Sequence, residues 1–184
     1  YKALTLQATN LIQIQTMKKI GIFYGSSTGT CEDLAHQIAG KLNVSEADIY
    51  SAEKLSAELV SKYEVLILGT STWGDGEMQD DWYDGIKALK AADLSGKEVA
   101  LFGCGDSESY TDTFCDGMGA IYDAVKDKGC SIIGNHVDAG SYNYSSSTAV
   151  VDGYFVGLAL DEINESEKTA SRIEEWTGEL KQCL

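Results

Sequence analysis

Short apolar runs alternate with helical stripes of apolar residues along most of the chain. Apolar runs without polar interruption, typical of strands buried on both faces, occur at residues 20–24, 65–68, 99–102, 131–133 and 154–156. Residues 48–51 predict one further short strand. Apolar positions three or four residues apart predict helices at 34–42, 82–89, 114–125 and 173–180. Alternating strands and helices predict a doubly wound α/β sandwich, in which helices cover both faces of a parallel sheet.

The first sixteen residues differ from the rest of the chain. Residues 1–16 contain one lysine and no acidic residue, whereas Met17 runs almost directly into the first predicted strand. We therefore expect a single domain over residues 17–184, preceded by an extension that is a remnant of upstream sequence. Residues 11–15 alternate weakly in polarity, which is compatible with an added strand.

Charge and cysteine content narrow the class of protein. The 184 residues include 14 basic and 29 acidic side chains, a formal charge of −15, which argues against nucleic acids and anionic membranes as partners. No apolar run approaches the roughly 18 residues of a spanning helix. The five cysteines are odd in number and form no C-x-x-C pair, so we expect no disulfide framework, no metal site and a reducing, cytoplasmic environment.

The loop at residues 25–31 has the composition of a phosphate cradle. Open α/β sheets bind ligands beyond the carboxyl ends of their strands, and this loop follows the first strand. It reads Gly-Ser-Ser-Thr-Gly-Thr-Cys and opens a helix, whose N–H groups and dipole favour an anion. The Gly-Lys-Ser/Thr ending of a Walker A loop is missing. The alternative is that the hydroxyls only cap the helix.

The loops after the next two central strands each carry an aromatic residue. Trp73 stands among glycines and hydroxyls at residues 69–77, and Tyr110 follows a glycine-rich stretch at 103–109. An indole left exposed there is suited to covering a flat aromatic ligand, although either ring could instead fold back onto a helix end. Glu108 occupies the third glycine position of a dinucleotide fingerprint, which excludes that motif. Together, the three loops fit flavin mononucleotide (FMN), with its ring between Trp73 and Tyr110.

The motifs of these loops resemble those of the long-chain flavodoxins. They are Phe-Tyr-Gly-Ser-Ser-Thr-Gly-Thr at 23–30, Thr-Trp-Gly-Asp-Gly-Glu at 72–77, and Phe-Gly-Cys-Gly-Asp at 102–106 followed by Tyr110 and Phe114-Cys115. The resemblance covers residues 17 to about 183. It implies a five-stranded parallel sheet of order 2-1-3-4-5, a fold in which flavodoxins are known to hold FMN at the switch point. It also implies that a long-chain insertion, residues 140–153, interrupts the last strand.

The same resemblance assigns the site residue by residue. The phosphate would be bound by Ser26, Ser27, Thr28, Gly29, Thr30 and Cys31. One ring face and N5 would be flanked by Ser71, Thr72, Trp73, Gly74 and Asp75. The pyrimidine edge and the other face would be met by Cys104, Gly105, Asp106, Tyr110, Thr113 and Phe114. Two positions depart from the family: Cys31 replaces a usual hydroxyl residue, and Ile163 replaces an Asp that many relatives place near the ribityl chain.

The function implied by the resemblance is low-potential, one-electron transfer by non-covalently bound FMN between its semiquinone and hydroquinone states. The protein would then be no enzyme but a monomeric, cytoplasmic carrier. Its partners would be basic redox proteins, such as a flavodoxin or ferredoxin reductase, and electron-accepting enzymes. An NAD(P)H:quinone or flavin reductase of the same fold is the alternative, and it requires a second pocket over the flavin. A third possibility is a phosphorylatable receiver domain. Such a domain needs acidic residues after the first strand, but Gly25, Ser26 and Ser27 occupy those positions.

Overall fold

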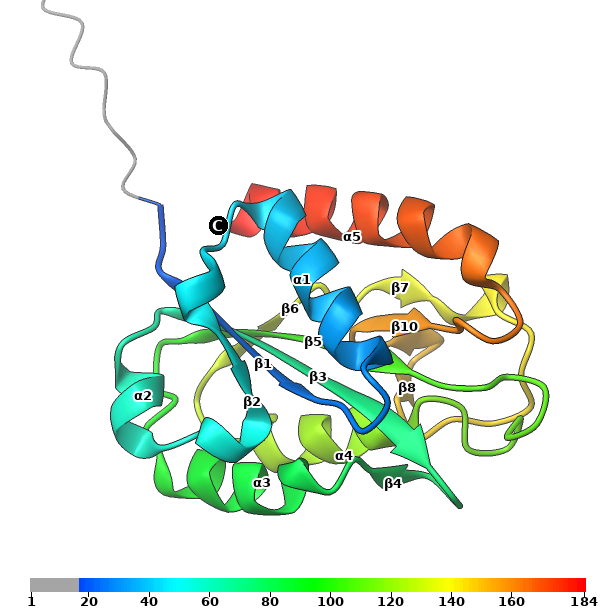
Figure 1. Cartoon of the computed structure of the whole chain (residues 1–184), viewed down its shortest axis with the longest axis horizontal. Coiled ribbons are helices and arrows are strands. Elements are labelled where there is room, and N and C mark those ends of the chain that lie inside the picture. Colours follow the sequence, from blue (N-terminus) through cyan, green and yellow to red (C-terminus); the bar gives the residue numbers. More distant parts are fainter. Residues whose placement is uncertain (1–16) are drawn as a thin grey trace, which may run out of the picture.

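A computed structural model describes residues 17–184, so the predicted boundary after residue 16 and the predicted strand at 11–15 lie outside the described residues. The central parallel sheet has the spatial order β2-β1-β3-β5-β10 (Figure 1). Its strands are β1 (Ile20–Gly25), β2 (Ile49–Ser51), β3 (Val65–Trp73), β5 (Glu98–Cys104) and β10 (Leu158–Leu160). In chain order this arrangement is 2-1-3-4-5, which confirms the predicted topology.

Helices cover both faces of the sheet. On one face α1 (Thr30–Leu42) packs beside α5 (Thr169–Cys183), and on the other α3 (Asp81–Ala91) packs beside α4 (Asp116–Val125) and the short α2 (Ala57–Ser61) (Figure 1). Single 3-10 turns η1 (Glu46–Asp48), η2 (Ala52–Lys54) and η4 (Ser166–Lys168) lie in the connections.

Each face of the sheet has its own apolar core. Side chains of successive strand residues point to opposite faces, so Leu66 and Leu68 join the core under α3 and α4, while Val65 and Ile67 join the core under α1 and α5. All four are fully buried. The uninterrupted apolar run at 65–68 is therefore explained by burial on both sides.

The strand containing Trp73 is longer than predicted. The sequence indicates a loop from residue 69, but β3 continues to Trp73 and turns back into β4 (Glu77–Met78). Thr72 pairs with Met78 and Trp73 with Glu77, and the Gly76 N–H donates to the Trp73 carbonyl at 3.2 Å. Trp73 thus lies at the tip of a β-hairpin, where strand pairing fixes its backbone.

The fifth strand is divided, and its second half lies at residues 158–160 instead of the predicted 154–156. β6 (Ser131–Ile133) pairs with the first half of β5 and β10 with the second. The predicted strand at 154–156 instead contributes β9 (Tyr154–Phe155) to a small antiparallel sheet with β7 (Val137–Asp138) and β8 (Val150–Val151), beside η3 (Ala139–Ser141). The insertion therefore begins near Gly134 and ends at Gly157, where a Cβ would lie 2.2 Å from the Leu101 carbonyl oxygen.

Candidate functional site

A cleft of about 200 Å³ opens at the carboxyl ends of β1, β3, β5 and β10. The three loops singled out in the sequence meet there. Ten of the predicted residues line the cleft: Thr28, Thr30, Ser71, Thr72, Trp73, Gly74, Cys104, Gly105, Asp106 and Tyr110. Glu162 and Ile163, which follow β10, complete the lining and were not predicted as ligand contacts.

The hydroxyls of the phosphate-cradle loop do not cap the first-turn N–H groups of α1. Gly29 is the N-cap of α1 and uses no side chain for capping, while the Gly29 N–H donates to Ser26 Oγ at 3.1 Å. Ser27, Thr28 and Thr30 are exposed. The alternative that these hydroxyls cap the helix is therefore wrong for α1. The loop presents hydroxyls and first-turn N–H groups at a helix N-terminus, which are donors suited to an anion.

A buried glutamine supports this loop from behind. The side chain of Gln79 is almost fully buried, and its Nε2 donates to Ser27 Oγ at 3.3 Å. Its Oε1 accepts from the Asp81 N–H at 2.9 Å, and its own N–H donates to Thr70 Oγ1 at 3.2 Å. Gln79 therefore connects the first loop to the β3–β4 hairpin. No periodic signal in the sequence marks it, because its partners lie on distant segments.

Two aromatic side chains stand exposed on the cleft. Trp73 is 43% exposed and Tyr110 is 51% exposed. The Trp73 Nε1–H donates to Ser71 Oγ at 2.8 Å, which orients the indole, and the Tyr110 N–H donates to the Asp106 carbonyl at 3.0 Å. Neither ring is folded into a helix end. Both offer apolar faces that a flat ligand would cover.

Among the described residues 17–184, those that line the cleft include no lysine or arginine. Two carboxylates, Asp106 and Glu162, contribute to the walls. The pKa of Asp106 lies below its ordinary value, chiefly because the Ser109 N–H donates to it, with a further hydrogen bond from Asn164. An anionic ligand group would therefore be held by neutral donors alone.

Phe114 is not brought to the cleft. Its side chain is 1% exposed and packs against Tyr142, Tyr144 and Phe155 of the insertion. A Cβ on Gly105 would lie 2.8 Å from the Phe114 ring, so Phe114 supports the cleft floor from below. The Phe114 ring is thus packed in the core and not in the cleft lining, and a cofactor contact of this residue stays a prediction.

The other predicted residues also lie outside the lining. Cys31 is buried on the sheet side of α1, where burial and the neighbouring Cys104 raise the pKa of its thiol. Its side chain is therefore turned away from the cradle. Thr113 is half-buried, and its N–H donates to the Tyr110 carbonyl at 3.2 Å. The remaining predicted site residues belong to the cleft loops but do not line the cleft: Ser26, Ser27, Gly29 and Asp75.

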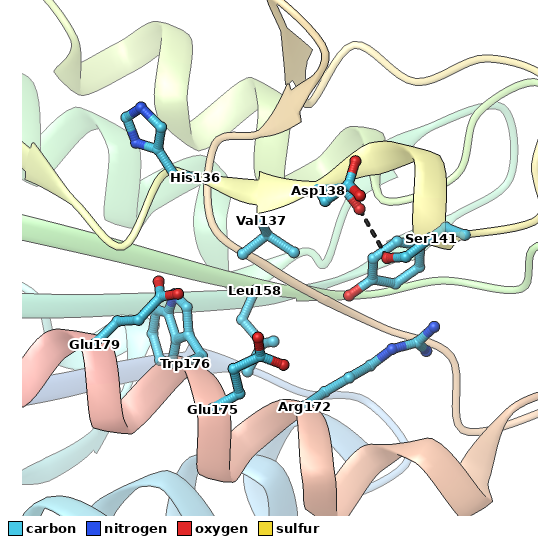
Figure 2. Close-up of a pocket in the computed structure, with 10 residues that line it drawn as sticks. His136, Val137, Asp138, Ser141, Leu158, Arg172, Glu175, Trp176 and Glu179 are labelled. Atoms are coloured by element: carbon cyan, nitrogen blue, oxygen red, sulfur yellow. Dashed lines mark hydrogen bonds between the residues drawn. The ribbon is translucent and has the colours of Figure 1, made fainter.

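A second cavity, of about 280 Å³, lies between α5 and the insertion (Figure 2). Its walls include Trp176, Arg172 and Glu175 on α5 and Val137 and Asp138 on β7. Most of these groups have partners within the protein. The Arg172 guanidinium stacks 4.0 Å from the centre of the Tyr142 ring and pairs with Glu165 at 2.8 Å, and Trp176 Nε1–H donates to the Gly134 carbonyl at 2.9 Å.

The described residues 17–184 contain no helix that is both long and apolar enough to cross a bilayer. Within the same residues, no three His, Cys, Asp or Glu side chains gather where they could hold a metal ion.

The protein has a doubly wound sheet and an aromatic-walled cleft at the point where the strand order reverses. These features are typical of α/β proteins that bind nucleotide-like ligands in that cleft. The chain matches the flavodoxin family over residues 22–176 and belongs to that family. It is 42% identical to Flavodoxin 1 of Escherichia coli strain K12 over 164 residues, which cover 89% of this chain and 93% of that protein. It is 40% identical to a flavodoxin of Haemophilus influenzae, over 91% of this chain and 98% of that one.

Among solved structures, a Fusobacterium nucleatum flavodoxin bound to flavin mononucleotide matches with a TM-score of 0.80 and 34% identity, over 90% of this chain and 98% of that one. Flavodoxins are electron-transfer proteins and not enzymes, so the prediction of a carrier is confirmed and the reductase alternative is set aside. Membership also implies redox proteins as partners in general.

Proposed function

We propose that the cleft binds FMN non-covalently and that the protein carries single electrons at low potential between redox proteins. The observation that carries the proposal is the arrangement of the cleft, in which exposed Trp73 and Tyr110 share one cavity with the hydroxyl-rich start of α1. That donor set fits a flat ring at one end and a phosphate at the other. When bound, FMN supplies the ring that accepts and releases electrons.

Different residues of the chain would bind different parts of FMN. Thr28, Thr30 and the N–H groups that open α1 would hold the phosphate, with Gln79 fixing Ser27 behind them. Trp73, oriented by Ser71, would cover one ring face and Tyr110 the other. Loop backbone at residues 104–106 would meet the polar edge of the ring. The aromatic cover on both faces would leave an edge through which electrons, but not hydride, can pass.

The formal charge of −15 supports basic proteins as partners, such as a flavodoxin or ferredoxin reductase, because opposite charges speed encounter and orient docking. We propose that the protein acts as a monomer in the cytoplasm.

Reconstitution tests the proposal. Purified protein mixed with FMN and freed of excess by gel filtration should retain about one FMN per chain, and stepwise reduction should proceed in two separate one-electron stages. The protein alone should oxidise NADPH no faster than free FMN does. Failure to retain FMN would overturn the proposal, and rapid NADPH turnover without a partner would favour a reductase.

A further inference from the structure

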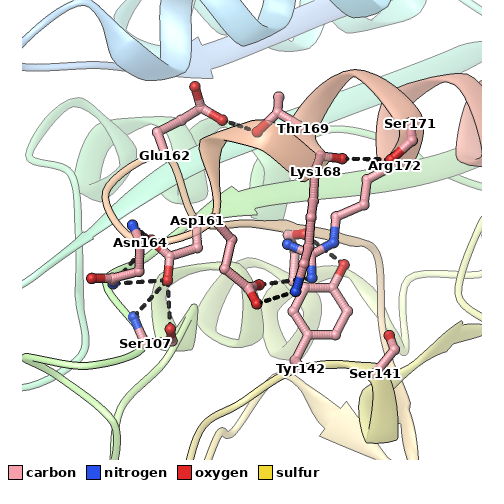
Figure 3. Close-up of polar contacts among 12 residues, drawn as sticks. Ser107, Ser141, Tyr142, Asp161, Glu162, Asn164, Lys168, Thr169, Ser171 and Arg172 are labelled. Carbon is pink, nitrogen blue, oxygen red and sulfur yellow. Dashed lines mark hydrogen bonds and ion pairs between the residues drawn. The ribbon is translucent and has the colours of Figure 1, made fainter.

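Asp161 is a fully buried carboxylate directly after β10 whose two oxygens face different loops of the cleft (Figure 3). Oδ2 accepts from the Ser107 N–H at 3.0 Å and from Ser107 Oγ at 2.5 Å. Oδ1 accepts from the N–H groups of Ile163 at 3.1 Å and Asn164 at 2.9 Å. Every contact is a donor, which is the environment that keeps a buried carboxylate ionised.

Asn164 adds a second link between the loop after β5 and the loop after β10. Its Nδ2 donates to Asp161 Oδ2 at 3.0 Å (Figure 3). The same Nδ2 donates to Asp106 Oδ1 at 2.8 Å. Burial alone would raise the pKa of Asp161, but the hydrogen bonds from Ser107 and Asn164 outweigh it and hold that pKa below its ordinary value. The loop after β5 and the loop after β10 are therefore joined through two carboxylates, Asp161 and Asp106.

The loop that carries Tyr110 has other anchors at its surface: Asn164 bonds Asp106, and Thr111, which follows Tyr110, bonds Ser145 and Ser146 of the insertion. Between residues 105 and 110 only Ser107 is buried, and its partner is Asp161. The Gly105 N–H donates to the Leu160 carbonyl at 3.0 Å, and beyond that point the loop bonds mainly within itself through Asp106. Tyr110 is exposed on this loop, whereas Ile163, 71% exposed, stands on the other. The Ser107–Asp161 contact is thus the link between the two walls that is made by buried side chains.

We propose that Asp161 is a positioning residue for the cofactor, which fixes the Tyr110 wall of the cleft relative to the Ile163 edge. The inference rests on the proposed function, because it assumes that the flavin ring occupies this cleft. A purely local role is the alternative: Oδ1 alone would close the turn at Ile163 and Asn164, and the contacts of Oδ2 with Ser107 would have no effect on the ligand.

The test compares the affinities for FMN and for riboflavin, which has the ring but no phosphate, measured by quenching of flavin fluorescence. In Asp161→Asn one acceptor oxygen becomes a donor amide, so one of the two loops loses its partner. We expect FMN and riboflavin to bind at least ten-fold more weakly, and by the same factor, because the phosphate loop is unchanged. The visible circular dichroism of the bound flavin should also change.

Asp93→Asn is the matched control. Asp93 likewise accepts a backbone N–H, from Ser95 at 2.9 Å, but it precedes β5 at the opposite end of the sheet. The Asp93→Asn variant should leave the affinities for FMN and riboflavin unaltered. Ser107→Ala removes only the hydroxyl contact with Oδ2 and keeps the turn at Ile163, so it should weaken both ligands by a smaller, equal factor.

Unchanged affinities and an unchanged visible spectrum in Asp161→Asn would overturn the inference, as would a loss confined to FMN. If Asp161→Asn does not fold, Ser107→Ala decides the question, and wild-type behaviour in that variant overturns the inference. Failure of the wild-type protein to bind FMN would instead overturn the proposed function on which the inference rests.

Discussion

Two cavities of similar volume differ in which of their wall groups remain available to a ligand. The cleft at the strand ends presents exposed aromatic rings, uncommitted hydroxyls and glycine backbone. In the cavity beneath the insertion, several wall groups already have partners: Arg172 stacks on Tyr142 and pairs with Glu165 through Nη2, and Ser141 Oγ–H donates to the Asp138 carbonyl at 2.8 Å. Among the described residues, Arg172 Nη1 alone of the wall's buried side-chain nitrogens and oxygens has no hydrogen-bond partner. Exposed aromatic rings and a hydroxyl-rich helix start, not volume, therefore distinguish the binding region from the region that secures the insertion.

A negative charge in the phosphate loop should give the largest effect. In Thr28→Asp a carboxylate would stand near the phosphate in a cleft whose lining has no cation. Two like charges about 4 Å apart at a protein surface cost on the order of 4 kcal/mol, so FMN affinity should fall by roughly a thousand-fold. Titration calorimetry measures it. Ser141→Asp, in the second cavity, should leave the affinity within about two-fold, and an equal loss in both variants would contradict the distinction.

Removing either exposed ring should have the next largest effect. Trp73→Ala and Tyr110→Ala each remove a stacked face worth ~0.5–1.5 kcal/mol beyond its area, which raises the FMN dissociation constant by roughly two- to ten-fold or more. Tyr83→Ala is the matched control, because Tyr83 is similarly exposed on α3 but does not line the cleft. Wild-type affinity in both cleft variants would show that the rings do not enclose the flavin.

Salt should slow association with a basic partner by several-fold between low and physiological ionic strength, where screening shortens the reach of charge to ~8 Å. Stopped-flow rates with a basic reductase measure it. Glu108→Gln, on the Tyr110 loop, should reduce the salt dependence more than Glu179→Gln, on the wall of the second cavity. A rate that does not change with salt would argue against charge-guided docking.

The smallest effect on FMN should come from Tyr142, which belongs to the second region. Its hydroxyl donates to the Ala159 carbonyl of β10 at 2.7 Å. Tyr142→Phe leaves that acceptor without its partner and should lower the free energy of unfolding by about 1 kcal/mol, as measured by urea denaturation of the apoprotein. FMN affinity should stay within two-fold. A ten-fold loss of affinity would mean that the insertion takes part in binding.

The sequence predicts most of the sheet and the ligand-facing rings because those features are local. The buried run at 65–68 indicates its strand directly, and Trp73 is conspicuous among glycines and hydroxyls. The strand order follows from the resemblance to the flavodoxins. The divided fifth strand is harder, since residues 154–156 and 158–160 are equally apolar and only pairing with β5 distinguishes them.

The supporting residues of the site could not be predicted in the same way. Besides partners two or three positions away, Gln79 and Asp161 have partners from nine to more than fifty positions away, and no window of sequence reveals those distant contacts. The sequence did not indicate that the Phe114 side chain packs in the core, because a motif identifies a segment but does not determine which way each side chain points. Cys31 is a similar case, since its place on the first turn of α1 turns the thiol towards the core.

The measurement that tests the account most directly is the set of backbone amide shifts that FMN induces in ¹⁵N-labelled protein, which at 19.8 kDa is suited to solution NMR. The account predicts the largest changes at residues 26–31, 71–76 and 104–110, with smaller ones at 161–164. Residues 136–142 and the exposed side of α5 should hardly change. Dominant shifts around the second cavity, with an unaffected cradle loop, would contradict it.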